Sequence, residues 1–464
     1  MEAGDWLLEH VRAMMQRPQR AAWALFPLFL VPILRKAHSA GIWHDEAYTF
    51  FTYVNRPVEE ILFFAEHYDA NNHPLNTLLI KVFVALLGSA EPVLRLPNLL
   101  ASGFFYWGVV AWFKDHKAEI WLAAPLLFQP LIWDFFAMAR GYGLALAALI
   151  WTLVFFQRYL DSRRTRTLHL SLLSALLMVE ANFSFLTAYL AFLCSVVLFT
   201  ADHDDKKKAW MITGGWLLLT FLLLVRPIHI LRTHGELYYG TRGKLLYSAL
   251  YNFVGTTYYQ RDASPWTMEQ WTWFLGIVVG LSVMAPLLGF WSCREWRKTT
   301  VLPLLLLLLG LLGNWLQHVL FGTPYPFNRT ALAYLPLLIL PLAGWGSRPL
   351  FKAAGILSLG ICGLHGMRVY SPVTFPEWAY DAYTRGGYEL YLERRAAGEG
   401  LSFSWILEPS LNYYRFRRAP AEPAYSIGPV DPEADWLLLL PEDRLPKTGR
   451  QLVKEFPNGL TLWH

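Results

Sequence analysis

An acidic pair marks the first polar stretch that can do chemistry in this sequence. Asp45 and Glu46 stand in the run WHDEAY (43–48), just after the first long apolar segment. A carboxylate pair where a chain leaves an apolar layer costs desolvation, so it usually has a function. Such a carboxylate can take a proton from a hydroxyl nucleophile. The alternative is that both acids only begin a helix, because negative side chains favour a helix N-terminus.

Three arginines are candidates for holding a phosphate. Arg95 lies in LRLP (94–97), and Arg329 ends the proline-rich run PYPFNR (324–329). Arg140 is the first residue of RGY (140–142), whose last residue, Tyr142, is a further candidate. Arginine binds phosphate through two parallel hydrogen bonds. Two alternatives remain open: Arg95 can reach from a helix end to lipid headgroups, and Arg329 can anchor its own turn.

Two further polar residues are candidates for substrate contact. His73, in NNHPLN (71–76), either meets a ligand or only forms the turn that precedes Pro74. Asp134 lies between apolar runs and either pairs with Arg140 or binds a metal, the ion pair being favoured. The tyrosines of the segment 229–271 either stack on sugar rings or pack at the membrane interface; they are Tyr238, Tyr239, Tyr251, Tyr258 and Tyr259.

The composition is that of a membrane protein. Of 464 residues, 55% are hydrophobic and 16% are charged, whereas soluble domains carry about 25% charged residues. The net charge of +5 comes without a long Lys/Arg block, which excludes a nucleic-acid surface. The three cysteines have no metal-ligand spacing, so we expect no metal site built on them.

Eleven apolar segments are long enough, or nearly long enough, to cross a bilayer. They are 21–37, 97–113, 119–136, 141–157, 168–182, 183–201, 209–228, 272–291, 300–320, 331–346 and 350–366. A shorter segment, 74–88, contains Lys81 and is expected to lie at the interface without crossing. The sequence therefore predicts an all-α polytopic protein with about eleven transmembrane helices plus interfacial helices.

The basic loops indicate the orientation. With a cytoplasmic N-terminus, every basic cluster between adjacent spans falls on the inner side, as the positive-inside rule requires. The clusters are Arg12/Arg17/Arg20, Lys114/Lys117, Arg158/Arg163/Arg164/Arg166, Lys206–Lys208, Arg294/Arg297/Lys298 and Arg348/Lys352. All the candidate polar residues then share the outer face, and so does the C-terminus. We expect a multi-pass protein of a bacterial inner (plasma) membrane.

The chain divides into two parts. Residues 1–366 form the transmembrane domain, with a first external loop over about 38–96. Residues 367–464 are richer in Glu, Arg, Pro and Gly and contain no run long enough to span. A helical stretch near 380–397 and short apolar runs at 403–407 and 435–440 predict a small external α/β domain.

The ordered motifs resemble the GT-C superfamily of integral-membrane glycosyltransferases. The likeness is strongest to the branch of the protein O-mannosyltransferases and the lipid A aminoarabinose transferase (families 39 and 83). It rests on the acidic pair at 45–46, the His-Pro-Leu motif at 73–75, the Arg-Leu-Pro element at 95–97 and the Arg-x-Tyr pair at 140–142. The His-Pro-Leu motif departs from the family pattern, because the second proline after His73 is missing.

The resemblance implies an activity and a set of roles. The donor would be a polyprenyl-phosphate sugar and the acceptor a hydroxyl of a lipid, glycan or protein at the outer face, with inversion at the anomeric carbon. The family's catalytic base falls on Asp45, with Glu46 in support. Asp134 stands where related enzymes often place a second acidic residue. No redox cofactor is required, and a divalent cation fits the mechanism but has no clear ligand set here.

Three other functions compete with this one. A transporter or flippase of a lipid-linked sugar would place charged groups near the midplane of paired repeats, and neither repeats nor such groups are evident. A membrane scaffold would leave the ordered motifs unexplained. An oligosaccharide transferase with a lipid-pyrophosphate donor is the nearest alternative among enzymes.

Overall fold

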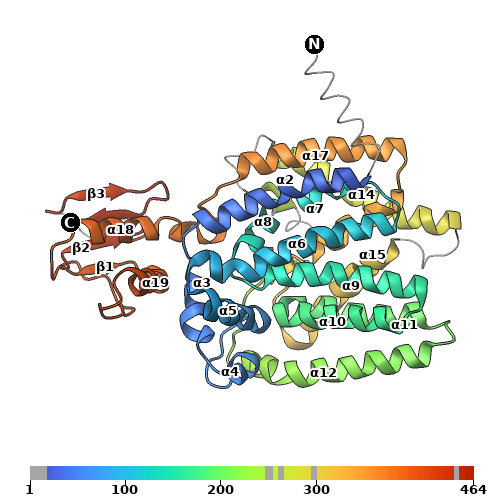
Figure 1. Ribbon diagram of the computed structural model, residues 1–464, viewed down its shortest axis with the longest axis horizontal. Helices are drawn as coiled ribbons and strands as arrows, with labels where there is room; N and C mark the ends of the chain where they lie inside the picture. The colour runs from blue at the N-terminus through green and yellow to red at the C-terminus, as the bar shows by residue number, and fades with distance from the viewer. Residues whose placement is uncertain (1–17, 246–253, 256, 260–265, 294–299, 444–448) are drawn as a thin grey trace, which may run out of the picture.

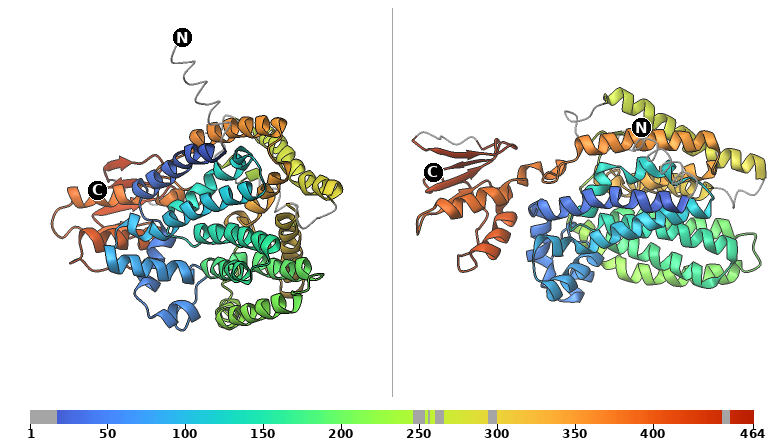
Figure 2. Two further views of the ribbon diagram at one scale, coloured as in Figure 1. Left: turned by 45° about the vertical axis from the view of Figure 1, so that its right-hand side comes forward. Right: turned by 45° about the horizontal axis from the view of Figure 1, so that its top comes forward.

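A computed structural model describes residues 18–245, 254–255, 257–259, 266–293, 300–443 and 449–464. Three features named above fall at least partly outside this range: Tyr251, and the basic clusters at 12–20 and 294–298. The long helices lie side by side in a bundle, and the C-terminal domain sits at one end of it (Figures 1 and 2).

Most of the described chain up to residue 369 is helical. The α-helices of this part are α2 (Pro18–Ser39), α3 (His44–Thr49), α4 (Val58–Phe63), α5 (Pro74–Leu87), α6 (Glu91–Asp115), α7 (Ala124–Leu127), α8 (Pro130–Ala137), α9 (Tyr142–Ser162), α10 (Thr165–Ala181), α11 (Leu186–Thr200), α12 (Lys206–Thr233), α14 (Met268–Cys293), α15 (Val301–Phe321), α16 (Tyr334–Ile339) and α17 (Pro349–Val369). Short 3-10 helices include η3 (Phe183–Phe185) and η5 (Asn328–Ala331), and a π-helix, η1 (Phe50–Val54), follows α3.

The polytopic helical architecture is confirmed. Within the described residues, seven helices are long and apolar enough to cross a membrane, and the number rises to nine if each of two bent helix pairs forms one span. The expected span 119–136 is such a pair, bent by 69°. Gln129 at the bend is extended, as a residue before proline must be. The expected spans 168–182 and 331–346 are shorter helical segments in the bundle.

The segment 38–96, which the sequence predicts to be external and which keeps the name first external loop here, contains the short helices α3, α4 and α5. They gather at one end of the bundle, whereas the connections α9–α10 and α11–α12, which hold two basic clusters, lie at the opposite end (Figure 1). Helix α5 has 14 residues and stays at its own end. Its Lys81 Nζ donates to the carbonyls of Val54 and Arg56, at 2.9 and 3.0 Å. Lys81 is therefore satisfied within the loop, as expected for an interfacial helix.

The C-terminal domain is a small α/β unit, as predicted. It contains α18 (Thr384–Arg394), α19 (Glu408–Arg418), β1 (Leu401–Phe403), β2 (Trp436–Leu439), β3 (Leu452–Glu455) and β4 (Thr461–Trp463). The strand order is β1-β2-β4-β3, with β1 and β2 parallel and the other pairs antiparallel. All four β2 residues are buried, and helices cover one face of this thin sheet (Figure 2).

This domain shares a core with the first external loop. Ile42, Ala47 and Phe50 pack in one buried cluster with Leu411 and Tyr413 of α19. Polar contacts reinforce the junction: Tyr414 OH accepts from Ile42 N at 2.7 Å, and His44 Nδ1 donates to Ile406 O at 2.8 Å. The helix that carries the acidic pair is thus held between the bundle and the C-terminal domain.

Candidate functional site

A cavity of about 640 Å³ lies where the first external loop meets the bundle. Its walls come from α3, the segment 69–73, the start of α9, the η3 turn with the start of α11, the end of α12, the segment 236–239, α15 and the segment 323–330. Five of the candidate residues line it: Asp45, His73, Arg140, Tyr142 and Arg329. Candidates as far apart in the chain as Asp45 and Arg329 therefore meet at one site.

The Asp45 carboxylate lies between two arginines. Arg140 Nη2 is 3.4 Å and Arg329 Nη1 is 4.0 Å from Asp45 Oδ2. Charge-assisted hydrogen bonds of this kind usually measure about 2.7–2.9 Å. The arginines are therefore close enough to attract Asp45 without being fully engaged by it. The Asp45 side chain is 19% exposed, so it is accessible from the cavity.

Asn71 fixes the position of Arg140 relative to the helix that carries Asp45. Its Nδ2 donates to Asp45 O and to Thr49 Oγ1, both at 3.0 Å. Arg140 Nη1 donates to the side-chain oxygen and, at 3.2 Å, to the backbone oxygen of Asn71. Asn71 was not among the candidates, although it stands two residues before His73 in the same motif.

Glu46 and Arg95 form a different kind of pair, which does not line the cavity. Arg95 Nη2 is 2.6 Å from Glu46 Oε2, and both side chains are at most 1% exposed. Arg95 also donates to the carbonyls of Ala37, Ala40 and Gly41, while Glu46 accepts from the backbone N–H of Ala139 at 2.6 Å. These two residues join α2, α3 and α6 to the segment before α9. Every strong hydrogen-bonding direction of the Arg95 guanidinium is used inside the protein.

Asp134 also lies outside this cavity. The ion pair expected with Arg140 is wrong, since Asp134 pairs with Lys36 of α2 and accepts a hydrogen bond from Tyr259. Lys36 carried no local signal in the sequence beyond its place at the end of the first apolar segment. Asp134 instead faces a second cavity of about 260 Å³, together with Glu377 and Trp378.

Glu377 lines the smaller cavity and contacts Arg329, which lines the larger one. It lies in the 3-10 helix η7 (Pro376–Asp381) and contacts Arg329 Nη1 at 2.8 Å. Burial raises the pKa of Glu377, and the charge of Arg329 offsets part of that rise. The Arg329 guanidinium also lies over the Tyr239 ring at 4.2 Å and the Trp378 ring at 5.0 Å. Arg329 therefore anchors its turn, as one alternative predicted, and faces the larger cavity as well.

His73 and Tyr142 line the larger cavity next to Arg140. Their rings lie 5.5 Å apart in an edge-on arrangement. His73 precedes α5 with an extended backbone, as expected for a residue before proline. Burial lowers the pKa of His73 well below its usual value, and the charges of Arg140 and Arg329 lower it further. His73 is therefore neutral at physiological pH.

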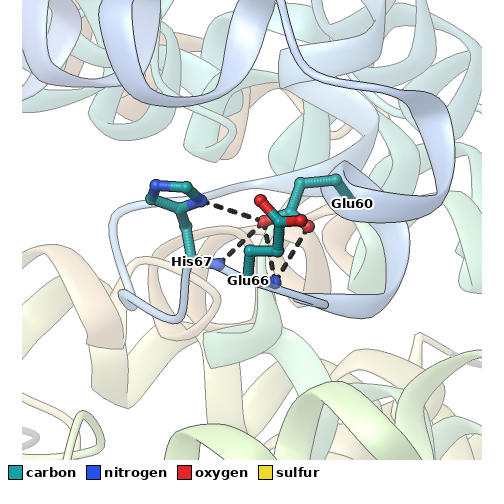
Figure 3. A group of neighbouring side chains, drawn as sticks. All are labelled: Glu60, Glu66 and His67. Carbon is teal, nitrogen blue, oxygen red and sulfur yellow. Dashed lines mark hydrogen bonds and ion pairs between the residues drawn. The ribbon is translucent and has the colours of Figure 1, made fainter.

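One group of side chains has the composition of a metal site. The ligand atoms of Glu60, Glu66 and His67 lie within 4.8 Å of one another (Figure 3). The Glu60 carboxylate, however, accepts the backbone N–H groups of Glu66 and His67 at 2.7–3.0 Å. These bonds shape the turn after α4, and the group is not in the cavity lining.

The fold is similar to that of the solved structure of ArnT, which agrees with the predicted resemblance at the level of the fold. The solved structure of ArnT from Cupriavidus metallidurans in the apo state aligns over 100% of this chain and 98% of that chain, with a TM-score of 0.51 and 10% identity. ArnT from the same organism bound to undecaprenyl phosphate aligns with a TM-score of 0.47, 12% identity and coverage of 99% and 98%. The sequence matches no protein-family profile and no curated protein.

Proposed function

We propose that this protein is an inverting glycosyltransferase that moves a sugar from a polyprenyl-phosphate carrier to a hydroxyl acceptor. The observation that carries the proposal is the position of Asp45 between Arg140 and Arg329 on the wall of a 640 Å³ cavity. The GT-C fold supports the same reaction class. The acceptor is a lipid, glycan or protein at the outer face, and the donor sugar is a hexose or a pentose.

In this reaction Asp45 accepts the proton of the acceptor hydroxyl. The acceptor oxygen forms a bond to the anomeric carbon as the bond from that carbon to the phosphate oxygen breaks. The electron pair of the broken bond leaves on the phosphate, and Arg140 and Arg329 stabilise that charge. Because both arginines stand at 3.4–4.0 Å from Asp45, an arriving phosphate can recruit them and leave Asp45 free to meet the acceptor hydroxyl.

The remaining candidates then act as support. Glu46 and Arg95 hold α3 in place, and Tyr142 packs against His73. No step needs a redox cofactor or a metal ion. We also propose a location in a bacterial inner membrane. The arrangement supports placing the first external loop and the C-terminal domain on the outer side, because both lie at the end of the bundle opposite the basic α9–α10 and α11–α12 connections.

Asp45→Asn tests the proposal. The substitution keeps the size of the side chain and removes the base, so we expect transfer from radiolabelled polyprenyl-phosphate sugars to fall by about 10²–10⁴-fold. Membranes that express wild type, Asp45→Asn and Asp115→Asn provide the comparison. Asp115 is a matched control because it pairs with Arg158 away from the cavity.

Transfer by Asp45→Asn at the wild-type rate would exclude Asp45 as the base. If wild type transfers no sugar from any donor but moves a lipid-linked sugar across the bilayer, the flippase alternative replaces this proposal.

A further inference from the structure

One wall of the larger cavity holds polar atoms that are buried and have no protein partner. Within the residues that the structure describes, His73 Nε2, Arg140 Nε, Asn182 Nδ2 and Ser184 Oγ make no hydrogen bond. All four side chains line the cavity. Asn182 is 2% exposed and His73 is 6% exposed. Buried polar groups are normally paired, because leaving one unsatisfied costs about 1–3 kcal/mol. Such a group at a cavity wall therefore indicates a ligand contact.

The backbone brings these groups together. Gly141 lies so close to the end of α10 that a Cβ placed on it would stand 1.7 Å from Ala181 O and 3.0 Å from the Cβ of His73. Asn182 follows Ala181 directly, and its Oδ1 accepts the backbone N–H of Ser184 at 2.9 Å. The η3 turn packs in addition against η5, the segment that holds Arg329. The α10–α11 turn is thus adjacent to both arginines.

The chemistry of this wall differs from that of the arginines. Asn182 and Ser184 carry no charge, and His73 is neutral in this environment. Neutral amide, hydroxyl and imidazole groups match the hydroxyls of a sugar, since each can donate or accept one hydrogen bond. A phosphate is better matched by the two guanidinium groups beside them.

We propose that Asn182 and Ser184, together with His73, bind hydroxyl groups of the sugar that is transferred. The inference rests on the proposed function and adds a sugar subsite to it, next to the arginines that hold the phosphate. Asn182 and Ser184 lie in a short turn without a catalytic motif, so neither was a candidate from the sequence.

The test compares the KM for the sugar-bearing carrier with the Ki of the carrier that has no sugar. Ser184→Ala removes only the unpartnered hydroxyl, because the backbone N–H still bonds Asn182. Asn182→Ser keeps an oxygen that can accept from Ser184 N and removes the unpartnered amide donor without adding a charge beside the arginines. We expect each change to raise the KM for the polyprenyl-phosphate sugar about three- to tenfold, as the loss of one neutral hydrogen bond would. The Ki of undecaprenyl phosphate without a sugar should stay within about twofold of wild type.

Three results would overturn the subsite. If the Ki for undecaprenyl phosphate rises in step with the KM, the wall holds the phosphate. If neither constant changes in either variant, Asn182 and Ser184 only shape the turn. If wild type neither transfers a sugar nor is bound by undecaprenyl phosphate, the proposed function itself fails. Ser174→Ala is the matched control, since this α10 hydroxyl bonds Leu170 O within its own helix.

Discussion

Two arginine–carboxylate pairs of this protein differ in how fully each is engaged. Arg95 and Glu46 meet at 2.6 Å in a fully buried contact and use their other hydrogen-bonding atoms on the backbone. Arg140 and Asp45 meet at 3.4 Å at a cavity wall. A saturated pair stabilises a fold, whereas an open pair can exchange partners with a substrate. The two adjacent acids thus differ in what surrounds them: Glu46 is buried in a saturated ion pair, whereas Asp45 is open to the cavity.

Glu46→Gln should therefore reduce stability. Breaking a buried ion pair leaves the Arg95 charge uncompensated, which costs about 3–5 kcal/mol. We expect a lower yield and a lower Tm for the detergent-purified variant, measured by intrinsic fluorescence during heating. Asp45→Asn, which changes a partly exposed side chain, should keep a Tm close to that of wild type. A Glu46→Gln protein that is as stable as wild type but inactive would instead assign Glu46 to the chemistry.

At the scale of elements, the site depends on the crossing of α9 and α10. Gly141 sits in an ordinary helical conformation, so any L-residue could adopt its backbone angles. The constraint is space, because the neighbouring atom is a backbone carbonyl that cannot rotate away. The glycine thereby sets the distance between the Arg140–Tyr142 segment and the Asn182 turn.

Gly141→Ala should push these segments apart. A displacement of about 1 Å near a reacting group can cost about 100-fold in rate, so we expect a loss of transfer of at least that order, accompanied by a lower Tm. Gly103→Ala in α6 is the matched control, since nothing lies within 4 Å of its added Cβ. Wild-type transfer by Gly141→Ala would show that the two segments can separate without harm to the site.

The elements that were predicted correctly carry their signal locally. Apolar runs of spanning length, the Lys81 segment and the strand-like runs of the C-terminal part each depend on neighbouring residues. The site was predicted only in part, since five of eight candidates line one cavity. Glu377 and Lys36 were missed because their partners, Arg329 and Asp134, lie 48 and 98 positions away. No local pattern in a sequence encodes such pairings.

At the scale of the whole molecule, a buried acid lies at the junction between the two parts of the chain. Burial raises the pKa of Asp381 to about 6, and hydrogen bonds from Ser410 and Thr384, both at 2.5 Å, oppose part of that rise. The folded protein therefore binds this proton more tightly than the unfolded chain, whose aspartate titrates near 3.8. The resulting stabilisation is complete below about pH 4 and is lost as the pH rises through about 6.

Asp381→Asn imitates the protonated acid and should remove this dependence. We expect the variant to match wild type near pH 4 and to be more stable by about 1–3 kcal/mol above pH 6. Thermal unfolding of both proteins between pH 4 and pH 8 measures the difference. Glu433→Gln, at an exposed acid of the same domain, controls for the general loss of one charge. A variant less stable than wild type at pH 7 would mean that the junction requires the ionised acid.

The core shared by the first external loop and the C-terminal domain also orders events in time. Ile42, Ala47 and Phe50 leave the ribosome early, but Leu411 and Tyr413, which pack against them, are made only after the helices of the bundle. Until then the helix that carries Asp45 lacks its outer support, however completely the bundle has entered the membrane. A nascent or prematurely terminated chain thus contains the acidic pair but lacks the C-terminal residues that hold α3 in place. We therefore expect the acidic pair to reach its final position only once the C-terminal domain has folded against it.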